Sequence, residues 1–196
     1  MTGRKVGMSL AVVGILATAL LLSWKPWQAA NEEGLVGGPI ELPATTGTFS
    51  LSDLGDDQIA VVFFGFTWCP DVCPMALSVI RQARQALPED QRQRVVPVLI
   101  SVDPERDSVE RLKEYLAFFG DDFIGATGSK AQLEDVGKRY NVKWRRQESQ
   151  DSALGYTMDH SASLYLVDAE GRVMQRVLHS PTPGPLQAAL EKVLGG

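Results

Sequence analysis

The sequence predicts one α/β domain preceded by a single transmembrane helix, and three observations predict it. Residues 61–66 form an uninterrupted apolar run, which is typical of a strand buried on both faces of a sheet. Strand and amphipathic helix patterns then alternate along the chain, as they do in folds whose sheet is covered by helices. Residues 6–24 contain no charged side chain and are long enough to cross a bilayer.

The N-terminal apolar segment has the features of a membrane anchor. As a helix, residues 6–24 would extend roughly 28 Å, close to the thickness of the hydrocarbon core. Two basic residues precede the segment and two tryptophans close it, namely Arg4, Lys5, Trp24 and Trp27. Basic residues favour the cytoplasmic side. We therefore expect residues 1–5 in the cytoplasm, an anchor in a bacterial inner membrane, and the rest in the periplasm or at the cell exterior. The alternative is a signal peptide cleaved near residues 28–30.

The remainder divides into a linker and one soluble domain. Residues 25–46 are rich in glycine, proline and small residues and are expected to form a linker, whereas residues 47–196 can bury a proper core. The chain carries a net charge of −5, and three basic residues but no acidic one precede residue 31, so the exported part is more acidic still. An acidic domain is a poor binder of nucleic acid.

The first elements of the domain follow from local patterns. Residues 48–51 are expected to add a short strand or hairpin. The strand at residues 61–66 is followed by a helix over residues 74–87, and residues 95–102 form a second apolar strand. Pro97 cannot donate a sheet hydrogen bond, which favours an edge position or an irregularity there.

Three further helices and a strand hairpin complete the domain. Acidic and serine residues suit the beginning of a helix over residues 107–119, and a shorter helix is expected over residues 131–140. Two strands joined by Ala-Glu-Gly and a last helix are expected at residues 163–168, 172–178 and 185–194. The polar residues 141–157 predict an exposed loop or hairpin. This order of elements is that of a thioredoxin-like fold with an extra helix and an N-terminal extension.

The two cysteines of the chain, Cys69 and Cys73, directly follow the buried strand, and each precedes a proline. Their C-x-x-x-C spacing is one residue longer than the redox C-x-x-C. A residue before proline prefers extended backbone, so Pro74 suits the first helical position, with Cys73 as the cap. A helix N-terminus favours thiolates, and two close thiolates form a disulfide or bind one soft cation such as Cu(I). The alternative is a pair of buried, inert structural cysteines.

One of the two histidines is a candidate third ligand. His160 lies immediately before the strand at residues 163–168, whose start faces the cysteine turn in a thioredoxin-like fold. A neutral imidazole there would complete a Cys-Cys-His site, trigonal for Cu(I), with a weak fourth ligand for Cu(II). The alternative for His160 is a hydrogen-bonding loop residue. His179, in a terminal loop, is expected to be exposed.

Several separated motifs together resemble the Sco/SenC family over residues 47–194. They are Gly47-x-Phe49-x-Leu51-x-Asp53, Thr67-x-Cys69-Pro70-Asp71-Val72-Cys73-Pro74, Asp103-Pro104-x-Arg106-Asp107, Tyr156-x-x-Asp159-His160-Ser161 and Tyr165-Leu166-x-Asp168. The resemblance implies a membrane-tethered, thioredoxin-like copper chaperone that helps to build the dinuclear copper centre of cytochrome c oxidase. It also implies that Cys69, Cys73 and His160 are the copper ligands. The chain departs from the family at residues 56–58, where relatives often have Gly-Lys.

Neighbouring polar residues are candidates for supporting roles. Asp71 and Asp159 are expected either to orient the ligands or a partner, or to serve turns and caps. Met158 is expected to belong to the core. Asp103 and Asp107 are expected to serve the loop and helix cap near the site, with Arg106 as their ion-pair partner.

Two functions remain open from the sequence. The first is copper delivery, with the copper-bearing subunit of cytochrome c oxidase as the partner, alongside other copper chaperones or thiol reductases. The second is a thiol-disulfide oxidoreductase that reduces partner cysteines so that they can accept copper. His160 separates the two, because thiol exchange does not need it and a three-ligand site does. Redox signalling by the cysteine pair is a third hypothesis.

Overall fold

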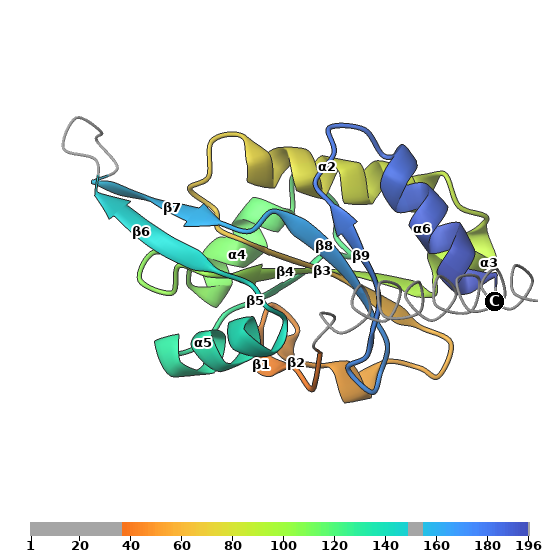
Figure 1. Ribbon diagram of the computed structural model, residues 1–196, viewed down its shortest axis with the longest axis horizontal. Helices are drawn as coiled ribbons and strands as arrows, with labels where there is room; N and C mark the ends of the chain where they lie inside the picture. Colours follow the sequence, from red (N-terminus) through yellow and green to blue (C-terminus); the bar gives the residue numbers. More distant parts are fainter. Residues whose placement is uncertain (1–36, 149–154, 196) are drawn as a thin grey trace, which may run out of the picture. The chain divides into compact units, whose positions relative to one another are not determined.

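The computed structural model describes residues 37–148 and 155–195. A seven-stranded mixed sheet has the order β2-β1-β5-β4-β3-β8-β9 (Figure 1). Its strands are β1 Glu41–Ala44, β2 Gly47–Ser50, β3 Ile59–Gly65, β4 Val95–Ser101, β5 Ile124–Ala126, β8 Ser163–Val167 and β9 Val173–Leu178. Strand β3 runs parallel to β4 and antiparallel to β8. Every residue of β3 is buried, which confirms the fully buried central strand.

Helices cover the sheet. They are η1 Leu51–Asp53, α2 Val72–Gln85, α3 Glu89–Arg92, α4 Val109–Leu116, α5 Lys130–Arg139 and α6 Gly184–Leu194. Figure 1 shows α2 and α6 together on one side of the sheet and α5 on the other. Caps fix where two of these helices begin. The Ser108 hydroxyl accepts from the backbone N–H of Arg111 at the start of α4, and Ser129 and Gln132 form a capping box on α5.

The folded domain begins before the predicted boundary at residue 47. Strand β1 pairs with β2 in the expected hairpin, and Ile40, Leu42 and Ala44 are buried in the core. Residues 41–44 therefore belong to the sheet, and the linker predicted over residues 25–46 was wrong from there on. The pattern was overlooked because one short strand with polar and proline neighbours carries little periodic signal.

Of the two alternatives predicted from Pro97, an edge position or an irregularity, the edge position was wrong, because β4 lies between β3 and β5. The proline is tolerated because β5 first pairs with β4 at Val98, one residue later, so Pro97 has a strand partner only on the β3 side. The short strand β5 and the single-turn helix α3 were not predicted.

A separate two-stranded sheet is formed by β6 Trp144–Glu148 and β7 Tyr156–His160. This antiparallel pair is a hairpin, one of the two forms expected for residues 141–157. It extends beyond that range to residue 160 and leads to β8 (Figure 1). Among the helices of residues 37–148 and 155–195, none is long and apolar enough to cross a bilayer. The anchor predicted at residues 6–24 lies outside the described residues.

Candidate metal centre

The cysteine turn connects the buried end of β3 to helix α2. Cys69 lies half-buried in this turn, and Cys73 lies fully buried in the first turn of the helix. The backbone N–H of Cys73 points at the Cys69 Sγ, 3.4 Å away. Gly65 makes room for the pair, because a Cβ at that position would lie 2.9 Å from the Cys73 Sγ. The turn therefore brings both sulfurs to the helix N-terminus, as expected.

The cap prediction needs a correction. Helix α2 begins at Val72 with Asp71 as the N-cap, so Cys73 and Pro74 occupy the second and third helical positions. Proline is accepted there because the first N–H groups of a helix have no partner within the helix.

His160 enters the same space from the β6–β7 hairpin. It is the last residue of β7, and its Nε2 lies 3.5 Å from the Cys73 Sγ. The other ring nitrogen, Nδ1, lies 3.2 Å from the carbonyl oxygen of Ser161. The rings of Phe63 and Phe66 meet the imidazole edge to face, with centroids 5.9 and 5.7 Å away. When Nδ1 carries the proton and donates a hydrogen bond to the carbonyl oxygen of Ser161, Nε2 presents its lone pair to the sulfurs.

The structure thus brings together the three residues singled out from the sequence. The two sulfurs and a ring nitrogen of His160 all lie within 4.8 Å of one another. Two thiolates and an imidazole form a soft donor set of the kind that binds Cu(I), and Zn²⁺ and Cu(II) also accept these ligands. Within residues 37–148 and 155–195, this is the one group of three His, Cys, Asp or Glu side chains close enough to hold an ion.

The two thiols differ in acidity. A hydrogen bond from the Cys73 thiol lowers the pKa of Cys69 and outweighs the opposing effect of burial. His160 and the backbone N–H groups of Asp71 and Cys73 lower that pKa further. The pKa of Cys73 is raised by the same hydrogen bond and by its burial. The hydrogen bond between the two thiols therefore favours the thiolate form at half-buried Cys69 and the protonated form at buried Cys73.

A buried carboxylate anchors the cysteine turn, which the sequence did not reveal. Asp107 is 1 % exposed. It accepts hydrogen bonds from the backbone N–H and the hydroxyl of Thr67, at 2.9 and 2.6 Å, and from the hydroxyl of Ser101, at 2.7 Å. The role expected for it in the loop near the site is confirmed by its bonds to Thr67, whereas the expected role as a helix cap was wrong, because Ser108 caps α4. Asp107 instead fixes the backbone two residues before Cys69.

The other candidates contribute less directly. The Asp71 side chain forms no capping hydrogen bond, and the backbone N–H of Asp71 donates a hydrogen bond to the Cys69 sulfur. The Asp159 carboxylate is exposed and binds Gln147 and Arg145 on β6, at 2.8 and 3.5 Å. Neither Asp71 nor Asp159 therefore has a side-chain hydrogen bond to a ligand that would support a role in orienting the ligands. Met158 packs against the core, and His179 does not belong to the cluster.

The expected ion pair of Arg106 is present, since its Nε lies 2.6 Å from the Asp103 carboxylate. Tyr156 joins this pair, because its hydroxyl donates to Asp103 at 2.8 Å. Sequence reasoning gave Tyr156 no role of its own. Its position four residues before His160 on one strand, on the same face, is the signal that was available.

A thioredoxin-like α/β fold with a Cys-Cys-His cluster at the exit of its central strand defines a protein with a site for a soft metal ion. This chain belongs to the SCO1/SenC family, whose model matches residues 28–195.

Relatives and solved structures agree with this assignment. An SCO2-like protein of Rickettsia prowazekii is 37% identical, with 86% of this chain and 85% of that protein covered. The crystal structure of Arabidopsis thaliana ScoI with copper bound is similar at 32% identity and a TM-score of 0.72, over 82% of this chain and 98% of that one. The structure of Bradyrhizobium japonicum ScoI with copper bound is similar at 34% identity and a TM-score of 0.70, over 81% and 99%.

Proposed function

We propose that this protein binds one copper ion through Cys69, Cys73 and His160 and delivers it to the dinuclear copper site of cytochrome c oxidase. The observation that carries the proposal is the approach of two sulfurs and one imidazole nitrogen to within 4.8 Å of one another. Two similar structures with copper bound, at 32% and 34% identity, favour copper over other soft metals. The role in oxidase assembly rests on the resemblance to the Sco/SenC family.

The three ligands differ in burial in a way that suits a copper ion that must be passed on to a partner. Cys69 and His160 are partly exposed, whereas Cys73 is buried. An incoming thiolate of a partner can therefore approach the ion from the Cys69 and His160 side and replace the ligands one at a time. The partners in this proposal are the copper-bearing oxidase subunit and other copper chaperones or thiol reductases. We further propose that residues 6–24 anchor the protein in a bacterial inner membrane, with the domain in the periplasm or at the cell exterior.

Metal content of the purified protein tests the proposal. The wild-type protein, loaded with copper and freed of excess ion, should retain one copper per chain. Cys69→Ser should retain little, and His160→Ala should lose Cu(II) affinity. His179→Ala is the matched control, because it removes the chain's other imidazole, which lies outside the cluster, and it should behave as wild type. Equal copper retention by wild type and Cys69→Ser would contradict the proposal.

A second function, thiol-disulfide exchange with a partner, is favoured by the partial exposure and lowered pKa of Cys69 beside buried Cys73, whose pKa is raised. The Cys69 thiolate would attack a partner disulfide, releasing one partner thiolate and forming a mixed disulfide. Cys73, after losing its proton, would then attack the Cys69 sulfur and release the second partner thiolate, leaving the partner with two thiols and this protein with a disulfide. A thiol reductase would supply two electrons to restore the pair. Oxidase assembly at low copper separates the functions. If the protein delivers copper, the His160→Ala variant should not support oxidase assembly. If it acts by thiol exchange, His160→Ala should support assembly, whereas either Cys→Ser variant should not.

A further inference from the structure

The position of His160 depends on how the β6–β7 hairpin is held. The hairpin is a two-stranded sheet of its own, and neither strand pairs with a described strand of the seven-stranded sheet. In β7, Tyr156, Met158 and His160 lie on one face and are buried or half-buried, whereas the two residues between them are exposed. This inward face carries the imidazole to the cysteines, so contacts along the hairpin decide where His160 lies.

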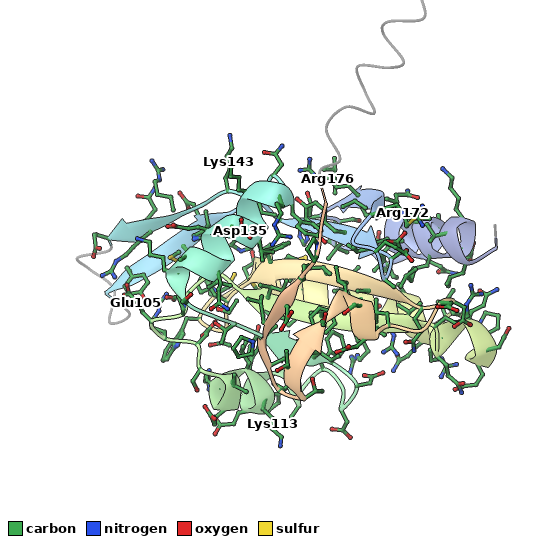
Figure 2. The ribbon with its side chains drawn as sticks, turned by 90° about the horizontal axis from the view of Figure 1, so that it is seen from below. Glu105, Lys113, Asp135, Lys143, Arg172 and Arg176 are labelled. Atoms are coloured by element: carbon green, nitrogen blue, oxygen red, sulfur yellow. The ribbon has the colours of Figure 1, made fainter. Side chains whose placement is uncertain are left out.

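Tyr156 holds the outer end of the hairpin on the loop that follows β4. Its hydroxyl donates to Asp103, and its carbonyl oxygen accepts from Arg106 Nη1 at 3.0 Å. The ring lies between two guanidinium groups, with the carbon of Arg106 3.6 Å and that of Arg146 3.7 Å from its centroid. Arg146 also binds Glu105, at 2.9 Å, at the end of the molecule where the hairpin projects (Figure 2).

Trp144 holds the base of the hairpin on α5. It is paired directly with His160 across the two strands. The indole packs on the helix at Gly137, so closely that a Cβ at Gly137 would overlap the ring. Tyr156 and Trp144 thus hold the hairpin at two separate points, which together fix its direction.

The outer contact shares its anchor with the cysteine turn. The backbone N–H of Asp103 donates to the Ser101 hydroxyl, which donates to Asp107, and Asp107 holds Thr67. One chain of hydrogen bonds therefore runs from Tyr156, at the start of the strand that carries His160, to the backbone before Cys69. Both halves of the cluster are placed relative to the same segment, residues 101–107, which comprises the end of β4 and the loop after it.

We propose that Tyr156 and Trp144 are positioning residues for His160, and that the hairpin they hold decides how strongly the site binds Cu(II). The copper part of this inference rests on the proposed function. Cu(I) accepts two thiolates alone, whereas Cu(II) gains from the imidazole. Loosening the hairpin should therefore weaken Cu(II) binding and leave Cu(I) binding nearly intact.

Tyr156→Phe tests the outer contact, with Tyr140→Phe as its control. Both variants remove one hydroxyl that donates a hydrogen bond, and Tyr140 donates to Gly38, outside this network. Loss of partners around a metal ligand typically costs about 10–100-fold in affinity. We expect Tyr156→Phe to raise the Cu(II) dissociation constant about tenfold and to shift the visible spectrum toward that of His160→Ala. Tyr140→Phe should match wild type.

Gly137→Ala tests the base contact independently. Alanine favours a helix by about 1 kcal/mol over glycine, so helix α5 itself should not be weakened, while the added methyl group displaces Trp144. Gly184→Ala in α6 is the control, because its Cβ would meet no atom within 4 Å. We expect weaker Cu(II) binding for Gly137→Ala alone.

Coupling to His160 decides whether these residues act through the ligand. In a His160→Ala background, Tyr156→Phe should cause no further loss of Cu(II) affinity. An equal loss in both backgrounds, or wild-type Cu(II) binding by both Tyr156→Phe and Gly137→Ala, would overturn the proposal. The metal-free protein gives a separate readout by NMR. The His160 ring signals should shift or broaden in both variants, and unchanged signals would overturn the proposal even if the wild-type protein bound no copper.

Discussion

Replacing Asp107 by asparagine should destabilise the domain by about 2 kcal/mol. The carboxylate is buried and accepts three hydrogen bonds, two of them from Thr67, two residues before Cys69. Hydrogen bonds to a charged group contribute about 1.5–3 kcal/mol each. Asparagine keeps the shape of the side chain but loses the negative charge. Its NH₂ group would also face the Thr67 and Ser101 groups that donate to Asp107, so at least one of these hydrogen bonds is lost. Some of this loss is recovered, because the Thr67 hydroxyl can turn and accept from the new amide.

The assay is urea unfolding followed by circular dichroism, with Asp135→Asn as the control. Asp135 is exposed (Figure 2), and its pair with Arg139 at 2.8 Å on α5 should contribute less than about 1 kcal/mol. A loss of about 2 kcal/mol should lower the melting temperature by roughly 4–8 °C for a chain of this size. Equal free energies of unfolding for the two variants would refute the assignment of Asp107 as the anchor of the cysteine turn.

Three further predictions follow from the site and the sequence. Oxidation of Cys69 and Cys73 to a disulfide should abolish copper binding, because the thiolate is the ligand; stoichiometric binding by protein with no free thiol would contradict this. Copper affinity should rise with pH through the neutral range, by up to about tenfold per unit, because the raised pKa of Cys73 keeps a proton there that binding must release. A pH-independent affinity would exclude proton release from Cys73. The full-length protein should resist salt and alkaline extraction from membranes through residues 6–24, and a soluble form beginning near residue 31 would instead indicate a cleaved signal peptide.

The parts of the fold that could be predicted are those in which the local sequence alone indicates that the residues are buried. The apolar run at residues 61–66 is hydrophobic on both faces, and it became the buried strand β3. The cysteine pair and His160 were predictable because a soft-metal site needs unusual residue types in few places. Strand β5, three residues with one glycine, carries no period that could distinguish it from a loop.

The supporting residues of the site were not predictable, because their roles depend on partners far away in the sequence. Asp107 and Thr67 are 40 residues apart, and Tyr156 and Asp103 are 53 apart. Aspartate beside serine before a helix is also the usual pattern of a cap. Only the folded backbone shows that Asp107 turns away from the helix and toward the cysteine turn.

X-ray absorption spectroscopy of the copper-loaded protein tests the central claim most directly, because it identifies the atoms bound to the metal. The Cys-Cys-His geometry predicts two sulfur neighbours and one nitrogen neighbour in the wild-type protein, with the imidazole signal lost in His160→Ala and retained in His179→Ala. A wild-type spectrum without sulfur, or one that His160→Ala leaves unchanged, would contradict the claim that Cys69, Cys73 and His160 hold the copper ion.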